Sequence, residues 1–306
     1  MLQEIRFKAM GTTVAASLYS ADAEQAQAVL QGVPAVLEEI EQQLSRFRKT
    51  SGLSLLNAAA GKGPQKVSPI LAEVCGLALL AAEESQGLFD PTVLTTLVNL
   101  GYDDSFKIVA ARADEGGNVE QPTERALWSQ VVVGPDDTVS LPAGSAIDLG
   151  GIAKGWAADL VAEQLKEYGP AMVSIGGDVR TTGPLEDGQP WVISVADPFS
   201  PDYNTHSVAL GDEAITTSGV GGRRWLRNGV WMHHLIDPRT QLPSTSEVHT
   251  VCVVGPSAVE CEIAGKVALL KGLHEGAFYL GKNGFEGVLF DHSGHSHPVG
   301  RRFQVP

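Results

Sequence analysis

The sequence predicts an α+β protein in which antiparallel sheets and packed helices form a single unit with two lobes. Helical patterns alternate along the chain with hairpin-like groups of short strands, and no regular repeat is visible. No linker separates two halves, so we expect residues 1–306 to form one domain. Hydrophobic residues make up 43% of the 306, which is enough for a substantial core.

The N-terminal part is expected to form a hairpin and then helices. Residues 5–20 read as two strands around a turn near Gly11. From 22 to 47 apolar residues recur at helical spacing, and Pro34 is expected to kink or split this helix. Two further helices are predicted at 53–57 and 68–85. The second of these begins with a Ser-Pro pair suited to a helix start.

The rest of the chain is expected to alternate in the same way. A helix follows the glycine-rich turn that ends at Gly155, and another is predicted from Glu260 to Lys271. The acidic, glycine-containing segment 114–118 is predicted to be a surface loop. Strands are expected at Ala171–Ser174, Trp191–Val195, Ala214–Thr217, Thr250–Val254 and in the tail from Phe285.

Charge and composition exclude several function classes. The net charge of -14 argues against binding to nucleic acid or to an anionic membrane, although a local basic pocket can still bind a small anion. The three cysteines, Cys75, Cys252 and Cys261, give neither a disulfide framework nor a metal cluster. The first residues lack a signal-peptide pattern and no apolar run is long enough to span a membrane, so we predict a cytoplasmic protein.

The run from Ile147 to Gly155 is the most informative stretch. It places Asp148, Lys154 and three glycines in a turn before a helix. The N–H groups and dipole of a helix N-terminus suit a phosphate group, and Lys154 adds a mobile positive charge. Such a turn can equally be a tight connection with no ligand.

Four more segments combine glycines, carboxylates, hydroxyls or imidazoles at turns. Each alone can be turn chemistry, because Asp beside Gly or Pro often bonds its own backbone. Five segments of this kind in one chain favour a binding or catalytic site. The four are Gly87–Val93, Ser174–Arg180, Ala214–Gly219 and His233–Thr240.

Together these segments resemble the ApbE family of flavin transferases. The resemblance extends from about Met10 to Gly272 and covers most of the chain. The Asp-Leu-Gly-Gly-Ile-Ala-Lys-Gly and His-Leu-Ile-Asp-Pro-Arg-Thr runs are specific in combination. The matching segments are Met10-Gly11-Thr12, Ser45-Arg46-Phe47 with Asn57, Gly87–Val93 with Leu97–Leu100, Ile147–Gly155, Ser174–Asp178, Thr217-Ser218-Gly219 and His234–Thr240.

The resemblance implies an ApbE-like, T-fold-like architecture and an FAD:protein FMN transferase activity. Such an enzyme cleaves the pyrophosphate of FAD with help from Mg²⁺ and releases AMP. FMN passes to a Ser or Thr hydroxyl of an acceptor protein that carries a Ser/Thr-Gly-Ala-Thr-like motif. The resemblance does not give the oligomeric state.

The resemblance also implies roles for individual residues. Met10 and Phe47 would contact the ring ends of the nucleotide, and Leu88, Phe89 and Asp90 would line its site. Asp148 and Lys154 would hold FAD, and Ile236 would touch it through its backbone. His234 is the candidate base for the acceptor hydroxyl, and the Gly151 carbonyl would face the metal. Our own inference is that Asp237 orients the His234 ring, although it could equally be a turn residue.

The sequence departs from the family at the metal site on the late helix. Glu262 and Lys266 stand where the family has Asp and Thr, four residues apart and on one helical face. Glu can still bind Mg²⁺, but an ammonium offers no lone pair and repels a cation. Either these two residues form an ordinary ion pair, or Lys266 replaces the cation beside the pyrophosphate.

A second departure follows Thr217-Ser218-Gly219. Arg223 and Arg224 bring positive charge where the family has an acid, and Gln241 stands where it prefers Gly. The leading interpretation is a transferase. The alternative is a family member that binds or hydrolyses FAD after losing or altering transfer, and a binding module without flavin is a third.

Overall fold

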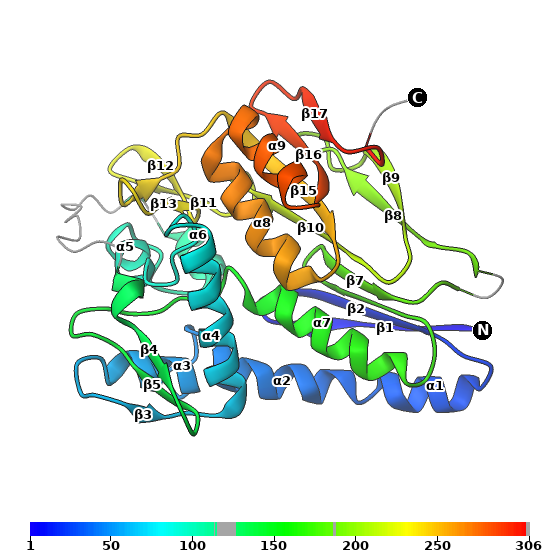
Figure 1. The fold of residues 1–306 in the computed structure, drawn as a ribbon, viewed down its shortest axis with the longest axis horizontal. Helices are drawn as coiled ribbons and strands as arrows, with labels where there is room; N and C mark the ends of the chain where they lie inside the picture. The colour runs from blue at the N-terminus through cyan, green and yellow to red at the C-terminus, as the bar shows by residue number, and fades with distance from the viewer. Residues whose placement is uncertain (113, 115–126, 186–187, 304–306) are drawn as a thin grey trace. The chain divides into compact units, whose positions relative to one another are not determined.

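The computed structural model describes residues 1–112, 114, 127–185 and 188–303, and the chain forms two compact units (Figure 1). Unit 1 comprises Met1–Glu39, Ile152–Gly219 and Ser246–Pro306, and unit 2 comprises Ile40–Gly151 and Val220–Thr245. Helices and antiparallel sheets occur in both, which confirms the α+β class. The single-domain organisation stays a prediction.

Unit 1 is built on an eight-stranded sheet in the order β1-β2-β6-β7-β10-β15-β16-β17. Every neighbouring pair is antiparallel. The strands are β1 (Leu2–Ala9), β2 (Thr12–Tyr19), β6 (Ala171–Ile175), β7 (Asp178–Thr182), β10 (Ala214–Gly219), β15 (Val248–Gly255), β16 (Glu286–Asp291) and β17 (Ser296–Val299).

Two tight turns in this sheet require unusual backbone angles. Met10 and Gly11, with φ of +50° and +68°, connect β1 to β2, and Gly176 and Gly177, with +66° and +97°, connect β6 to β7. Positive φ at both central residues is the pattern that matches the twist of a two-residue hairpin. Glycine adopts it readily, whereas Met10 is a non-glycine residue in a sparsely populated region.

Helices cover one face of the sheet and a two-stranded ribbon helps to cover the other. α7 packs on β6 and β7, α8 packs on β10 and β15, and α7 also packs against α8 (Figure 1). The helices of unit 1 are α1 (Ala23–Leu30), α7 (Ala153–Lys166), α8 (Ala258–Lys271) and α9 (Leu273–Lys282), and α2 (Val33–Leu44) continues from unit 1 into unit 2.

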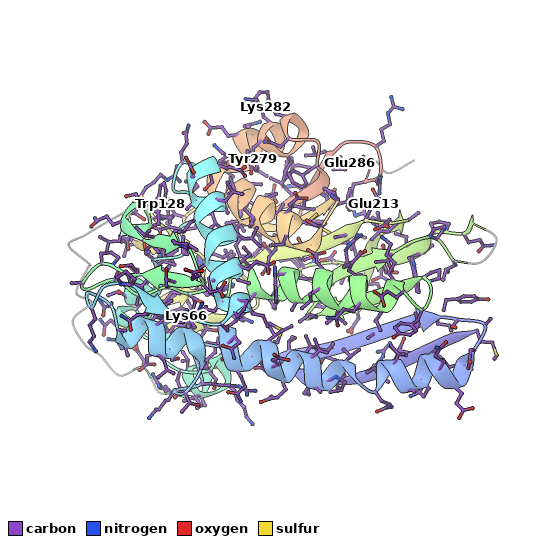
Figure 2. The ribbon with its side chains drawn as sticks, turned by 60° about the horizontal axis from the view of Figure 1, so that its bottom comes forward. Lys66, Trp128, Glu213, Tyr279, Lys282 and Glu286 are labelled. Carbon is purple, nitrogen blue, oxygen red and sulfur yellow. The ribbon has the colours of Figure 1, made fainter. Side chains whose placement is uncertain are left out.

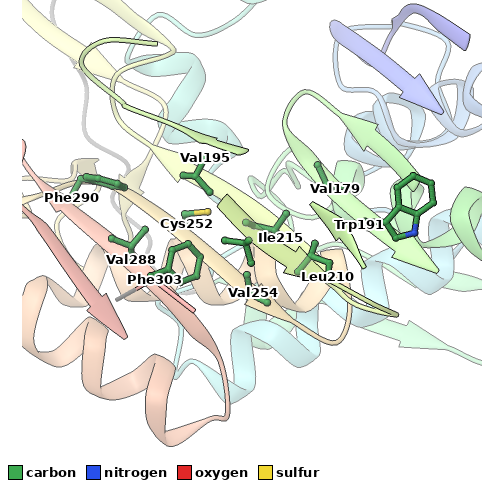
Figure 3. Close-up of a cluster of buried hydrophobic side chains, with 11 residues drawn as sticks. Val179, Trp191, Val195, Leu210, Ile215, Cys252, Val254, Val288, Phe290 and Phe303 are labelled. Carbon is green, nitrogen blue, oxygen red and sulfur yellow. The ribbon is translucent and has the colours of Figure 1, made fainter. Parts of the chain in front are cut away.

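Alternation along β15 separates these two faces. Val253 lies against α8, close to Gly265, whereas Cys252 and Val254 belong to the opposite core (Figure 3). That core is completed by β8 (Trp191–Ala196) and β9 (Asn204–Leu210), whose inward side chains include Trp191 and Leu210.

Over its described residues, unit 2 contains α-helices of 6 to 16 residues and three small sheets. A core of Leu97, Leu100, Tyr102, Val109, Trp225 and Ile236 joins its helices to β11 and β13. Trp225 donates its indole N–H to the Leu100 carbonyl at 2.7 Å. The elements are α3 (Gly52–Ala58), β3 (Gln65–Lys66), α4 (Pro69–Glu84), α5 (Leu94–Asn99), α6 (Phe106–Ala111), η1 (Leu127–Gln130), β4 (Val132–Gly134), β5 (Thr138–Ser140), β11 (Arg224–Arg227), β12 (Val230–His233), β13 (Ile236–Asp237) and β14 (Leu242–Pro243).

The elements predicted from the sequence are largely confirmed. The N-terminal hairpin and the predicted strands are present, and the long helical stretch is split. Pro34 is the second residue of α2, where its missing N–H costs no helical hydrogen bond. α8 begins two residues before the expected Glu260, because Ser257 caps it. The predicted loop at 114–118 lies outside the described residues except for Asp114.

Two further expectations concern cysteines and membranes. Cys75, Cys252 and Cys261 are buried and free of disulfides. Among the helices that the structure describes, none combines the length and the apolar character needed to cross a bilayer.

Arg302 connects two carboxylates at one edge of unit 1, Glu213 and Glu286, both labelled in Figure 2. Its guanidinium donates to both oxygens of Glu213, at 2.8 and 2.7 Å, and its Nε donates to Glu286 at 3.0 Å. The hydrogen bond from Arg302 lowers the pKa of Glu213. Partial burial opposes ionisation of Glu286, but the backbone N–H groups of Arg302 and Arg301 outweigh it and lower that pKa too.

We expect Arg302→Gln to lower the melting temperature at pH 7 but to have less effect in acid. Carboxylates with depressed pKa values stabilise the fold above their ordinary value of 4.5, and this contribution disappears as the pH falls through the lowered values. The loss at pH 7 should be about 1 kcal/mol, since the groups are partly exposed. Thermal unfolding from pH 7 to 3, with the exposed Arg301→Gln as control, measures it. A loss that is equal at pH 7 and pH 3 would contradict this account.

Candidate functional site

Four charged side chains meet at α7, β7 and α8 in unit 1, and we call them the four-charge cluster: Lys154, Asp178, Glu262 and Lys266. The Lys154 ammonium lies 3.1 Å from Oε1 of Glu262 and forms a second ion pair with Asp178. The Lys266 ammonium lies 3.1 Å from the same Glu262 oxygen. The structure therefore brings together three residues singled out in the sequence, and adds Asp178.

The side chains of the two acids in this cluster are more buried than those of the two lysines. The side chains of Asp178 and Glu262 are 3% and 2% exposed, whereas those of Lys154 and Lys266 are 19% and 15% exposed. Buried charges are tolerated when each has a partner of opposite sign. The two acid side chains thus form the buried base of the cluster, and the two lysine side chains are its more exposed part.

Gly155 explains how Glu262 reaches the start of α7. A Cβ at Gly155 would lie 2.7 Å from the Ala258 carbonyl oxygen, so only glycine permits this approach of α7 to α8. The Gly155 N–H then donates to Oε2 of Glu262 at 2.9 Å. One carboxylate is therefore held by a backbone donor and by two ammonium groups.

Asp159 fixes the other end of the same contact. Its carboxylate, on α7, accepts hydrogen bonds from the N–H groups of Ala258 and Val259 at 2.8 and 2.9 Å. These N–H groups belong to the first turn of α8, where intrahelical partners are lacking. Asp159 therefore holds the N-terminus of α8 against α7 and keeps Glu262 in register with Lys154.

The tight β6–β7 turn positions Asp178. Gly176 and Gly177 make the turn, and Asp178 is the first residue of β7. Its Oδ1 accepts a hydrogen bond from the Thr217 N–H at 3.4 Å, while Oδ2 receives Lys154. Both oxygens of Asp178 are thus engaged within unit 1.

Burial and pairing compete in setting the pKa values of the cluster. Burial disfavours the charged form of Lys154, but Glu262 and Asp178 outweigh it and raise its pKa. Burial likewise opposes ionisation of Glu262, yet Lys154 and Lys266 lower its pKa. Burial dominates at the other two groups, raising the pKa of Asp178 and lowering that of Lys266.

The donor set of the cluster does not suit a divalent cation. Mg²⁺ needs oxygen ligands in near-octahedral geometry, but both oxygens of Glu262 already accept from N–H donors. Lys266 offers no lone pair and carries a charge that repels a cation. Across the described ranges, no group of three or more His, Cys, Asp or Glu side chains could hold a metal ion. The Glu262 and Gly151 ligation implied by the resemblance thus lacks support in the cluster.

Unit 2 holds the second group of predicted residues, centred on Asp148 and Arg46. Nε of Arg46 lies 3.3 Å from Oδ2 of Asp148, and Nη1 donates to the Tyr102 carbonyl at 2.9 Å. The guanidinium also stacks on two rings, 4.2 Å from the centroid of Phe47 and 4.4 Å from that of Tyr102. Arg46, which the sequence analysis did not assign to the site, therefore connects the predicted residues Asp148 and Phe47.

Backbone contacts hold Asp148 in a defined conformation. Its N–H donates to the Pro91 carbonyl at 2.8 Å, and its Oδ1 accepts from the Gly150 N–H at 2.7 Å. Next to it, the Asn57 side chain donates to the carbonyl of Ile147 and accepts from its N–H, at 2.9 and 2.8 Å. The Asn57 that accompanies the Ser-Arg-Phe segment in the resemblance thus has a structural role.

The predicted residues Leu88, Phe89 and Asp90 differ in exposure. Leu88 is half-buried, whereas Phe89 and Asp90 are 6% and 8% exposed. Asp90 accepts hydrogen bonds from the N–H and the hydroxyl of Thr92, at 2.7 and 2.5 Å. Burial raises the pKa of Asp90. Turn chemistry therefore accounts for the contacts of this carboxylate in the structure.

The His233–Thr240 segment contains two histidines and a buried acid, Asp237. His233 donates Nε2–H to the Ser244 carbonyl at 3.0 Å, and His234 is half-buried in the following bend. The Asp237 carboxylate is engaged by Arg239, whose Nε and Nη2 donate at 2.9 and 2.7 Å. Its predicted role in orienting His234 stays a prediction. Ile236 lies in the core of unit 2, 6% exposed.

The comparisons decide the family. A family model described as the ApbE family matches residues 10–289. The chain belongs to the ApbE family. Among curated ApbE relatives, the FAD:protein FMN transferase of Treponema pallidum is 31% identical over 89% of this chain and 79% of its own length. That of Vibrio cholerae is 32% identical over 74% of this chain and 68% of its own length.

Solved ApbE structures share the fold. The ApbE protein of Thermotoga maritima gives a TM-score of 0.84 at 25% identity and covers 98% of this chain and 97% of its own. The flavin transferase ApbE of Vibrio cholerae gives 0.79 at 27% identity and covers 99% and 98%. The two curated relatives and the Vibrio cholerae structure are named as transferases, which does not favour the alternative of a family member that has lost transfer.

We expect Gly155→Ala to destabilise the protein by about 1–3 kcal/mol, because the new methyl group would overlap the Ala258 carbonyl in a packed contact. The matched control is Gly76→Ala in α4, where an added Cβ has nothing within 4 Å. That change should be neutral or stabilising by up to about 1 kcal/mol. Urea unfolding of both variants measures the difference, and equal stabilities would show that the α7–α8 approach is less tight than described.

Proposed function

We propose that this chain is an FAD:protein FMN transferase. The relatives of Treponema pallidum and Vibrio cholerae carry that name and are 31% and 32% identical to it. The family match spans residues 10–289 and thus includes the four-charge cluster and the Asp148 and His234 segments. The proposal covers the substrate FAD, the product AMP and an acceptor protein.

The structural observation that carries the proposal is the placement of Lys154. It is the second residue of α7, and two buried carboxylates fix its ammonium at the start of the helix. Ile152, the N-cap residue of α7, has no side-chain acceptor of its own, and Glu262 accepts the Gly155 N–H of the first turn. A fixed ammonium at the start of a helix favours a phosphate ligand.

In the proposed reaction, a hydroxyl oxygen of the acceptor attacks the phosphorus that carries the flavin side of FAD. A new P–O ester bond forms while the P–O bond to the bridging oxygen breaks, and AMP leaves with that oxygen. The hydroxyl proton passes to the imidazole of His234. Lys154 stabilises negative charge on the nonbridging oxygens.

The remaining predicted residues are proposed to bind FAD. Asp148, which Arg46 and backbone bonds hold in one conformation, is proposed to accept hydrogen bonds from the nucleotide. Phe47 is 45% exposed and offers an aromatic face, with Arg46 stacked on the ring. The other proposed contacts are Met10, Leu88, Phe89, Asp90 and the backbone of Ile236.

The acceptor is proposed to be a protein with a Ser/Thr-Gly-Ala-Thr-like motif. Arg223 and Arg224, where the resemblance would place an acid, give this chain a different charge beside that recognition segment. The cytoplasmic location and the organisation of residues 1–306 as one domain stay predictions from the sequence.

We expect His234→Ala to lower the rate of FMN transfer to a peptide carrying Ser-Gly-Ala-Thr by at least about 100-fold, because the acceptor hydroxyl loses its base. FAD affinity should change little. The measurement is mass spectrometry of the peptide after incubation with FAD, where one FMN unit is gained, with FAD affinity from fluorescence titration.

The control is His274→Ala, an exposed histidine on α9, which should transfer at the rate of the unchanged protein. Transfer by His234→Ala at the unchanged rate would remove His234 from the mechanism. Release of AMP and FMN by the unchanged protein without labelling of any acceptor would instead indicate a hydrolase.

A further inference from the structure

Lys266 is placed as a fixed positive charge within the four-charge cluster. Its ammonium lies 3.1 Å from Oε1 of Glu262 and 3.3 Å from the Glu262 carbonyl oxygen. It shares that carboxylate oxygen with Lys154, so one atom of Glu262 holds both ammonium groups close together. The side chain of Lys266 is nevertheless 15% exposed.

We propose that Lys266 acts as a resident cation, so that this chain binds the diphosphate of FAD between two ammonium groups and needs no divalent metal ion. The inference rests on the proposed function and specifies how its phosphate charge is neutralised. It follows from the disagreement between the donor set of the cluster and the Mg²⁺ that the resemblance implies.

Counting N–H donors supports this role. An ammonium has three N–H groups. Within the described residues, Lys154 directs two of them to Asp178 and Glu262, and Lys266 directs two to the side chain and carbonyl of Glu262. Each ammonium therefore retains one donor for a ligand, and two adjacent donors match two nonbridging oxygens of a diphosphate.

The charge balance supports it as well. Two carboxylates and two ammonium groups sum to zero, so the buried part of the cluster is neutral without a metal ion. A divalent ion would have to displace the N–H donors from Glu262 and would face two ammonium groups at close range. Removing Lys266 would leave Oε1 of Glu262 paired with Lys154 alone, so that this oxygen could also bind a cation.

The test is calorimetric titration of FAD into the full chain, in EDTA and in Mg²⁺ at matched ionic strength. The unchanged protein should bind FAD with the same Kd, within about twofold, in both buffers. Lys266→Met should weaken binding at least about tenfold in both, because it removes one charge-assisted hydrogen bond to the diphosphate. Lys266→Thr should weaken binding in EDTA and recover it in Mg²⁺.

One control variant and two further measurements accompany the titrations. Lys271→Thr removes a lysine from the end of the same helix and should bind FAD like the unchanged protein in both buffers. Mn²⁺ binding followed by electron paramagnetic resonance gives a readout without FAD. Lys266→Thr should bind Mn²⁺ and the unchanged protein should not. Circular dichroism confirms that each variant is folded.

The outcomes separate this inference from the proposed function. A tenfold or greater gain in FAD affinity on adding Mg²⁺ to the unchanged protein overturns the resident cation but leaves the transferase intact. Unchanged FAD affinity of Lys266→Met in EDTA also overturns it. If the unchanged protein binds FAD neither in EDTA nor in Mg²⁺, the resident cation and the proposed transferase are both overturned.

Discussion

The site in unit 1 depends on one buried carboxylate, that of Glu262. It receives the Gly155 N–H on one oxygen and the ammonium groups of Lys154 and Lys266 on the other. This single group therefore links the first turn of α7 to the middle of α8 and fixes both cations. If the Glu262 carboxylate were neutral, the ammonium groups of Lys154 and Lys266 would lie close together with only Asp178 to balance them. The repulsion between two like charges is costly at low dielectric.

The geometry that permits this arrangement is set by small features of the helices. Gly155 allows the backbone of α7 to approach α8, and Asp159 caps the N-terminus of α8 from the same helix. The sheet contributes Asp178 from a glycine turn between β6 and β7. Rigid elements thus present the lysine side chains, whereas the carboxylates that hold them stay buried. Such preorganisation favours binding of an anion without prior rearrangement.

Much of the fold was predictable from local patterns. Alternation, helix caps and glycine turns located most strands and helices, because these signals act within a few residues. The glycine-rich turn selected Lys154, whereas the family resemblance selected Glu262 and Lys266, whose spacing of four places them on one helical face. The pairing of Lys154 with Glu262 could not be predicted in this way, because 108 residues separate them.

Two residues were missed for related reasons. Asp178 lay within a recognised glycine segment, but its partner Lys154 comes from another element, so the sequence gave no sign of their ion pair. Arg46 stood inside the Ser-Arg-Phe segment, yet its contact with Asp148 depends on the path of the chain over 102 residues. The available signal for Asp178 and Arg46 was a charged residue, inside a recognised segment, for which the sequence suggested no partner.

The most direct test of the central claim is a crystal structure of the FAD complex grown with Mn²⁺, using anomalous scattering to locate the metal. Our account predicts diphosphate oxygens within hydrogen-bond distance of both Lys154 and Lys266, and no anomalous peak beside Glu262. A manganese peak on Glu262, with the Lys266 ammonium turned away from the diphosphate, would contradict it.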